Sequence, residues 1–190
     1  LEPRFSISDA IKVGRLVRYS YRIHDCPLTD DEESEFFRLT QLIAHASARE
    51  NGDTEWIAKL RRDRANIVKQ AANKTNLAVK TLLEVGQRQS HWLVYCNSVS
   101  HIDEVKLALS NVGIKTLSYH SKLPKEQRRA VIKHFEREGG YLLAVHCLDQ
   151  GVDIPKINAA LILASSTNPR EYIQRRGRIL RWTSDKHFAD

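Results

Sequence analysis

The segment best suited to chemistry lies near the carboxyl end and reads Gln174-Arg175-Arg176-Gly177-Arg178-Ile179-Leu180-Arg181. Arg175 and Arg178 are three positions apart, so a helix would place both on one face. Two adjacent guanidinium groups repel each other unless an anion neutralises them, and their planar forks suit phosphate oxygens. Gly177 between them would let a ligand or a neighbouring backbone approach closely. The segment therefore indicates phosphate chemistry, in which an arginine stabilises charge during phosphoryl transfer, with a solvated basic helix as the alternative.

A second candidate segment follows the apolar run 141–145 and reads Leu148-Asp149-Gln150-Gly151-Val152-Asp153-Ile154-Pro155. Gly151 allows a tight backbone path, and the carboxylate of Asp153 can accept hydrogen bonds from sugar hydroxyls or from an arginine. Alone the pattern is weak, because Gly-x-Asp turns are common in loops. It gains weight because a single apolar run separates it from the arginine-rich segment.

The other residue types used in catalysis or metal binding show no pattern of their own. The eight histidines and the three cysteines lack the spacing of a zinc site. The sequence also contains no Gly-x-x-x-x-Gly-Lys-Ser/Thr phosphate loop and no Asp-Glu-x-His/Asp segment that would hold magnesium. If the arginine-rich segment serves a nucleotide, the residues that grip its phosphates and its metal are expected elsewhere.

Composition limits the class of protein. The 190 residues include 30 Lys and Arg against 23 Asp and Glu, a formal charge of +7, and 42% are hydrophobic. This length supports one globular core with an appended subdomain. The pI of about 9.4 favours an acidic partner, nucleic acid above all. We expect no membrane span and no signal peptide. The three widely spaced cysteines form no disulfide framework, which favours a cytoplasmic location, and the lack of methionine favours a fragment of a longer chain.

Hydrophobic periodicity in the first half predicts one strand and two helices. Residues 16–23 alternate as a strand does, after a helical turn at 8–13. Thr29-Asp30-Asp31-Glu32 has the spacing of a capping box and opens a helix that ends near residue 51. A longer helix is predicted from 54 to 85, and its apolar stripe is interrupted near Asn73-Lys74, which favours a kink or break there. The two helices would form an antiparallel hairpin.

From residue 90 onward, short apolar runs alternate with helical segments. Strands are predicted at 92–95, 114–119, 141–145 and 159–163. Between them, a helix capped at Ser100 ends at Gly113, and another runs from 124 to about 137 and ends at Gly139-Gly140. Asn168-Pro169 opens a last helix. This alternation predicts an α/β fold with a mainly parallel sheet, and ligands gather at the carboxyl ends of the strands in such sheets.

Residues 90–183 resemble the second motor lobe of superfamily 2 helicases of the DEAD/DEAH type. Four stretches occur in the same order as four motifs of the family. Residues 91–98 look like motif IV, residues 119–121 like motif IVa, residues 148–155 like motif V and residues 174–181 like motif VI. Residues 6–17 are similar to the segment that joins the two lobes in restriction-type and excision-repair DNA helicases. The resemblance implies a RecA-like three-layer sandwich with a mainly parallel sheet and an inserted helical hairpin. The expected division is linker and strand over 1–28, hairpin over 29–88 and lobe over 89–190.

The resemblance also implies roles for particular residues. Arg175 and Arg178 would contact the phosphates of ATP, with Arg178 as the arginine finger, and the cleft would be completed by Gln174, Gly151 and Asp153. The nucleic-acid backbone would be met by Asn97, Ser98, His120 and Ser121. Mg²⁺ would be held by an absent first RecA-like lobe of the same polypeptide, so this half of the motor alone should not hydrolyse ATP. Many family members bind a phosphate with a threonine where this chain has Val145-His146-Cys147, which puts that contact in doubt.

The outer face of the second predicted helix adds a possible nucleic-acid contact. Its basic side chains include Arg61, Arg62, Arg64 and Lys69, which form a stripe that could follow a phosphate backbone or could simply be solvated. We therefore interpret the chain as a lobe of an ATP-dependent DNA helicase or translocase, with repair or restriction as the favoured context. The alternatives are a non-enzymatic nucleic-acid-binding module and a lobe of an RNA helicase, because contacts that track the backbone ignore most base identity.

Overall fold

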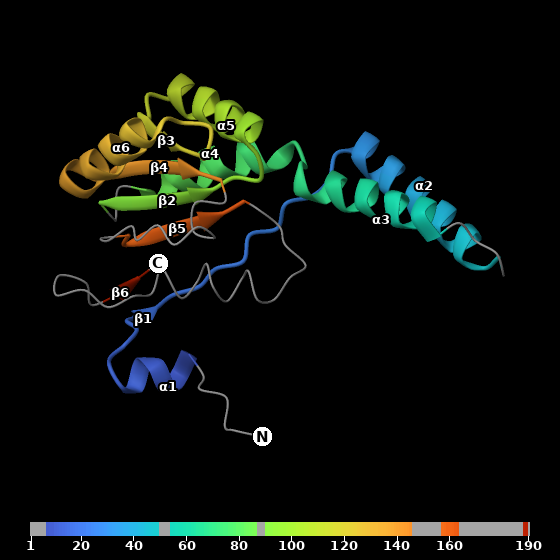
Figure 1. Ribbon diagram of the computed structural model, residues 1–190, viewed down its shortest axis with the longest axis horizontal. Coiled ribbons are helices and arrows are strands. Elements are labelled where there is room, and N and C mark those ends of the chain that lie inside the picture. The colour runs from blue at the N-terminus through green and yellow to red at the C-terminus, as the bar shows by residue number, and fades with distance from the viewer. Residues whose placement is uncertain (1–6, 50–53, 87–89, 146–156, 164–187, 190) are drawn as a thin grey trace. The chain divides into compact units, whose positions relative to one another are not determined.

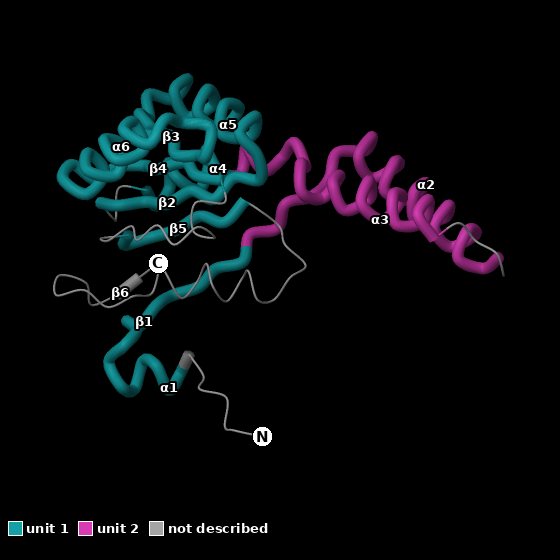
Figure 2. The backbone as a smooth tube through the Cα atoms, in the orientation of Figure 1, with its two compact units in different colours: residues 1–23, 78–190 teal, residues 24–77 magenta. Residues whose placement is uncertain are grey.

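The computed structural model describes residues 7–49, 54–86, 90–145, 157–163 and 188–189. The chain packs as two compact units (Figure 2): residues 1–23 with 78–190, and residues 24–77. Figure 1 shows the order of the helices and strands along the chain. The helix predicted after Asn168 lies outside the described residues. Within the described ranges, no helix is both long and apolar enough to cross a membrane.

The first unit contains a four-stranded sheet in which every pair of neighbours is parallel. Its strands, in spatial order, are β3 (Thr116–Tyr119), β4 (Gly140–Ala144), β2 (His91–Tyr95) and β5 (Ala159–Ile162). All four strands predicted from residue 90 onward are present, with ends that differ from the expected ones by one or two residues. The predicted α/β class with a mainly parallel sheet is confirmed.

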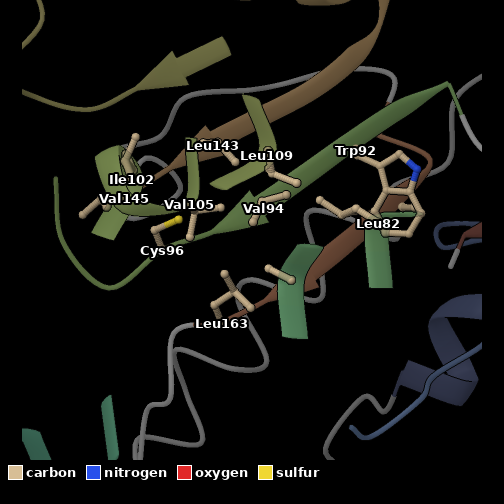
Figure 3. Packing of buried hydrophobic residues seen from close by; sticks show 12 residues of the cluster. Leu82, Trp92, Val94, Cys96, Ile102, Val105, Leu109, Leu143, Val145 and Leu163 are labelled. Carbon is tan, nitrogen blue, oxygen red and sulfur yellow. The ribbon is translucent and has the colours of Figure 1, made fainter. Parts of the chain in front are cut away.

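Helices cover both faces of this sheet because both faces are apolar. Trp92 and Val94 of β2 pack with apolar residues of α4 (Asn73–Val85) and α5 (Val99–Asn111), as Figure 3 shows for Leu82, Ile102, Val105 and Leu109. The alternate residues, Leu93 and Tyr95, pack with Phe135 of α6 (Lys125–Glu138). The alternation along β2 thus produces three layers, with α4 and α5 on one face and α6 on the other.

Two local predictions in this unit need correction. Ser98, and not Ser100, caps α5, because Ser98 has extended backbone and its Oγ accepts the backbone N–H of His101 at 3.1 Å. The strand predicted at 16–23 is reduced to β1 (Arg18–Tyr19), which pairs in parallel with β6 (Phe188–Ala189) and follows α1 (Ile7–Lys12). Alternating hydrophobicity indicates an extended backbone, but it does not show which residues of 16–23 pair with another strand.

Gly139 ends α6 as predicted, and no other residue fits there. Its φ is +73°, and a Cβ atom would collide with the carbonyl oxygen of Ser90. The backbone N–H of Gly140 donates to that same oxygen at 2.7 Å. Glycine therefore allows α6 to end directly against the start of β2, so that β4 begins in register.

The second unit contains the predicted helical hairpin. α2 (Asp30–Ser47) and α3 (Thr54–Lys69) lie side by side (Figure 1) and bury Leu39, Ile43 and Leu60 between them. The capping box at Thr29 is confirmed, since Thr29 and Glu32 each accept the other's backbone N–H. The domain boundaries predicted at 28/29 and 88/89 remain predictions, although Ala78 and Leu82 of α4 lie in the core of the first unit.

The long helix predicted from 54 to 85 is divided, close to the interruption seen in its apolar stripe. Residues 70–72 separate α3 from α4. Two side chains satisfy backbone groups there: Glu32 accepts the Ala72 N–H at 2.9 Å, and Lys74 donates to the Lys69 carbonyl at 3.1 Å. Asn73, at the start of α4, donates to the carbonyl of Pro27 at 2.9 Å. The break is therefore held by specific hydrogen bonds.

Glu32 connects the start of α2 to this break, and its ionised form is the one that is stabilised. Partial burial raises the pKa of its carboxyl group, but the hydrogen bonds from the backbone N–H groups of Thr29 and Ala72 outweigh burial and lower the pKa below its usual value of 4.5. The stabilisation is thus present above pH 4.5 and is lost as the pH falls through the lower pKa of the folded state.

We expect Glu32→Gln to lower the free energy of unfolding by about 1 kcal/mol at pH 7, because one acceptor oxygen becomes an NH2 group and the other loses its charge. The difference from wild type should shrink when urea unfolding is repeated at pH 3. Glu33→Gln is the matched control, since Glu33 is exposed in the same helical turn. Equal losses for the two variants, or a pH-independent difference, would contradict the role given to Glu32.

Candidate functional site

The carboxyl ends of the parallel strands lie level at one edge of the sheet. Tyr95 at the end of β2 is in register with Ala144 of β4 and Ile162 of β5, and Ala144 is also in register with Tyr119 of β3. The loop after β2 carries Asn97 and Ser98, and the loop after β3 carries His120 and Ser121. The structure therefore brings these four predicted nucleic-acid residues to one edge, with the two loops separated by two strand spacings, about 10 Å.

The loop after β2 is held by hydrogen bonds to the start of α5. The Oγ of Ser98 accepts the backbone N–H of His101 at 3.1 Å and lies 2.8 Å from the Oγ of Ser100. The backbone N–H of Asn97 donates to Nδ1 of His101 at 3.3 Å. Nδ1 must therefore be the unprotonated nitrogen of this imidazole. Ser98 serves as a helix cap, so any contact that it makes with a ligand must use its remaining hydrogen-bonding capacity.

The loop after β3 combines an exposed hydroxyl with a buried, unpaired nitrogen. Ser121 is exposed, and the carbonyl of His120 accepts the N–H of Leu123 at 3.1 Å in a turn. Nδ1 of His120 is buried without a hydrogen-bond partner in the part of the chain that the structure describes. A buried polar atom in this state is unfavourable, and a hydrogen bond would relieve it.

A cationic pocket next to this loop was missed by the sequence analysis. The pocket has a volume of about 360 Å³ and lies between β3 and α6, where it is lined by Tyr119, Lys125, Arg128, Arg129, Ile132, Lys133 and Glu136. Four cations thus face one carboxylate, and Nε of Arg128 is buried without a partner among the described residues. This arrangement favours an anion. The signal was the spacing of four between Lys125, Arg129 and Lys133, which places them on one helical face.

The predicted basic stripe on α3 is divided by the structure. Arg61 and Arg62 are exposed. The guanidinium of Arg64 instead lies 5.4 Å from the centre of the Phe36 ring, and its Nη1 donates to Oγ1 of Thr40 at 3.2 Å. Arg64 therefore joins α3 to α2, and Lys69 is only half exposed. The surface that remains open to a phosphate backbone is centred on the two exposed arginines.

The residues predicted to face ATP lie outside the described residues: Gly151, Asp153, Gln174, Arg175 and Arg178. Their roles remain predictions. Over the described ranges, no group of three or more His, Cys, Asp or Glu side chains could hold a metal ion. Burial and the nearby charge of Glu104 raise the pKa of Cys96 to about 12, so its thiol is protonated at neutral pH and is a poor nucleophile.

The fold and the polar edge of its sheet correspond to the second lobe of a superfamily 2 helicase. Residues 73–183, more than half of the chain, match the helicase conserved C-terminal domain. The chain belongs to this family. The RecA-like fold expected from the resemblance is confirmed.

The chain is similar to several helicases over about half of its length. DEAD-box ATP-dependent RNA helicase 50 of Oryza sativa subsp. japonica is 29% identical over 122 residues, which cover 60% of this chain and 19% of the relative. ATP-dependent RNA helicase DHH1 of Encephalitozoon cuniculi is 28% identical over 87 residues, or 45% of this chain and 18% of the relative. The probable helicase A859L of African swine fever virus is 27% identical over 117 residues, or 59% and 13%. The chain spans a fifth or less of the length of these relatives.

Solved structures share the fold. The Sulfolobus solfataricus SWI2/SNF2 ATPase C-terminal domain has a TM-score of 0.59 at 11% identity and covers 78% of this chain and 71% of its own. The C-terminal part of the Fun30 ATPase domain has a TM-score of 0.54 at 17% identity, and the match covers 92% of this chain and 62% of the Fun30 chain. The E. coli DEAD-box protein SrmB, bound to regulator of ribonuclease activity A, has a TM-score of 0.50 at 23% identity, with 61% and 67% covered.

The contacts of Arg64 lead to a prediction about stability. Arg64→Ala should lower the free energy of unfolding by about 1 kcal/mol, because it removes a cation–π contact and a hydrogen bond between α2 and α3. Arg61→Ala should change it by less than about 0.5 kcal/mol. Urea unfolding of both variants and of Phe36→Leu with and without Arg64→Ala gives the coupling between the two side chains. Strictly additive losses would show that the cation–π contact contributes nothing.

Proposed function

We propose that this chain is the second motor lobe of an ATP-dependent nucleic-acid helicase or translocase. The observation that carries the proposal is the match of residues 73–183 to the helicase conserved C-terminal domain, on a parallel sheet whose carboxyl edge gathers polar residues. The similar helicases are named as ATP-dependent enzymes, which supports ATP hydrolysis in the full-length protein. A first RecA-like lobe would supply the phosphate loop and hold Mg²⁺, and opening and closing of the cleft between the lobes would move the protein along a strand.

The nucleotide side of the proposal rests on the arginine-rich segment. Arg175 and Arg178 would bind the phosphates of ATP, and Arg178 would act as the arginine finger. Gln174, Gly151 and Asp153 would complete this lobe's side of the cleft. ATP supplies the phosphoryl group that is transferred to water, and Mg²⁺ in the first lobe would neutralise part of its charge.

In the full-length protein, Arg178→Ala should lower kcat for ATP hydrolysis by roughly 10³-fold or more, while the KM for ATP changes much less. The reason is that a finger arginine interacts most strongly with the charge that develops in the transition state. Arg176→Ala is the matched control, one position off the face shared by Arg175 and Arg178. Equal effects of the two substitutions would identify a structural basic helix. A full-length protein that binds nucleic acid but hydrolyses no ATP would be the non-enzymatic binding module.

The nucleic-acid side of the proposal rests on three groups of residues. Two belong to the first unit: the polar loop residues at the carboxyl edge of the sheet, and the cationic pocket between β3 and α6. The third is the exposed pair of α3 in the second unit, Arg61 and Arg62. Arg64 and Lys69, which follow on the same helix, complete the predicted basic stripe. Each group suits a phosphate backbone, whose charge is the feature that all nucleic acids share.

The salt dependence of binding can show which cations contact phosphate. Each contact on a single strand contributes about 0.7 to the slope of log affinity against log salt. If both lysines contact phosphate, Lys125→Gln with Lys133→Gln should weaken binding and reduce the slope by about 1.4. Arg61→Gln with Arg62→Gln tests the α3 surface in the same way. Lys106→Gln with Lys115→Gln removes the same charge from two exposed positions elsewhere, and an equal effect of this control pair would mean that only net charge matters.

The type of nucleic acid is the finer part of the proposal. Residues 6–17 favour DNA and a repair or restriction context, whereas most of the relatives named above are RNA helicases, which makes RNA the second candidate. Carrying out the same titrations with DNA and RNA strands of one sequence separates them. The DNA proposal requires tighter binding to DNA and stronger stimulation of the full-length ATPase by DNA. A preference for RNA would contradict the DNA proposal, and the proposal that the chain is a motor lobe would be unaffected. We also propose a cytoplasmic location without membrane attachment.

A further inference from the structure

His101 is a polar side chain at a position where packing alone does not require one. It lies in the first turn of α5 with 8% of its surface exposed. The apolar face of the same helix is already supplied by Ile102, Val105 and Leu109, each fully buried. Burying an imidazole costs free energy unless its nitrogens find hydrogen-bond partners. The partners of His101 should therefore show what this residue does.

Two hydrogen bonds join His101 to the loop after β2. Its backbone N–H donates to Oγ of Ser98 at 3.1 Å, and its ring Nδ1 accepts the backbone N–H of Asn97 at 3.3 Å. The first bond is an ordinary helix cap that any residue at this position could make. The second needs an acceptor at the end of a short side chain, and it orients a peptide group that precedes the cap.

The same loop is fixed at both of its ends. Cys96 donates its backbone N–H to the Ala144 carbonyl at 2.9 Å, which continues the β2–β4 ladder, and Ile102 donates to the Ser98 carbonyl at 3.1 Å within the helix. Asn97 lies between these two anchors, where the backbone turns from strand to helix. The bond to His101 constrains the peptide group between Cys96 and Asn97, directly before the side chains of Asn97 and Ser98.

We propose that His101 is a positioning residue that orients the Asn97–Ser98 loop for contact with the sugar-phosphate backbone of a bound nucleic acid. The inference rests on the proposed function, because Asn97 and Ser98 are contacts predicted there. His101 does not itself touch the nucleic acid. It keeps the loop in one conformation before binding, so the cost of ordering the loop is not subtracted from affinity.

Side-chain geometry supplies a matched set of variants. The Oδ1 of asparagine occupies the place of Nδ1, so His101→Asn keeps an acceptor for the Asn97 N–H. The polar atoms of glutamine lie one bond further out, so His101→Gln removes the acceptor from that place while the residue stays polar. His101→Leu removes it and keeps apolar volume. The Asn variant loses buried volume and should unfold more easily. The Leu variant keeps that volume and exchanges a buried imidazole for an apolar group, which offsets the lost hydrogen bond, so it should unfold at a higher midpoint than the Asn variant.

The experiment measures three quantities for each variant of this chain: the hydrogen-exchange protection of the Asn97 amide by NMR, the unfolding midpoint, and affinity for a single-stranded homopolymer oligonucleotide. We expect His101→Leu and His101→Gln to lose the protection and to bind about fivefold to tenfold more weakly, the effect of about one hydrogen bond. We expect His101→Asn to retain both protection and affinity despite its lower midpoint. A merely structural role would instead make affinity follow stability.

The possible failures are distinguishable. Unchanged protection of Asn97 in His101→Leu, or lost protection with unchanged affinity, would overturn the inference. If the wild type shows the protection that depends on His101 but binds no oligonucleotide, or if Asn97→Ala and Ser98→Ala bind as tightly as wild type, the nucleic-acid contacts of the proposed function are wrong. The positioning role in binding then falls with them.

Discussion

The parallel pairing of β2, β3, β4 and β5 is the constraint on which the rest of the structure depends. Parallel neighbours cannot be joined by a tight turn, so α5 and α6 must carry the chain back along the sheet. Both faces of β2 are then covered, which explains why Leu93 and Val94 are equally buried although they point in opposite directions. The same pairing brings the two described strand-to-helix loops, those after β2 and β3, to one edge of the sheet, where polar residues need not be buried.

The positive charge of the chain is also unevenly distributed over its surface. Helical crossovers bury one face and leave the other to solvent, and on α6 a row of cations adjoins the pocket beside β3. Cations so close together destabilise the unliganded protein slightly, a cost that a bound anion removes. The second unit has its own exposed pair, Arg61 and Arg62, while Arg64 is engaged with Phe36. The formal charge of +7 is thus concentrated in part on surfaces that suit a polyanion.

Hydrophobic period and caps were sufficient to predict most of the fold from the sequence. The strands of the sheet, the capping box at Thr29 and the end of α6 at Gly139 were all predicted, because each depends on a local pattern. The family also followed, since ordered motifs carry it. The cationic pocket was missed because its residues come from two elements, and the contact of Arg64 with Phe36 requires the pairing of α2 with α3. The roles of the arginine-rich segment rest on resemblance alone.

Predictions of local boundaries failed or shifted where a side chain takes the place of a backbone partner. At the break between α3 and α4, Glu32 and Lys74 bond the Ala72 N–H and the Lys69 carbonyl, which an unbroken helix would have paired internally. Burial lowers the pKa of Lys74, so the carbonyl of Lys69 binds an ammonium that is costly to desolvate. At the start of α5, Ser98 and His101 play the corresponding part. Hydrophobic periodicity reports which residues face a core, and it carries no record of such bonds. These sites are also where the backbone leaves its regular path, so their side chains determine where the neighbouring helices begin.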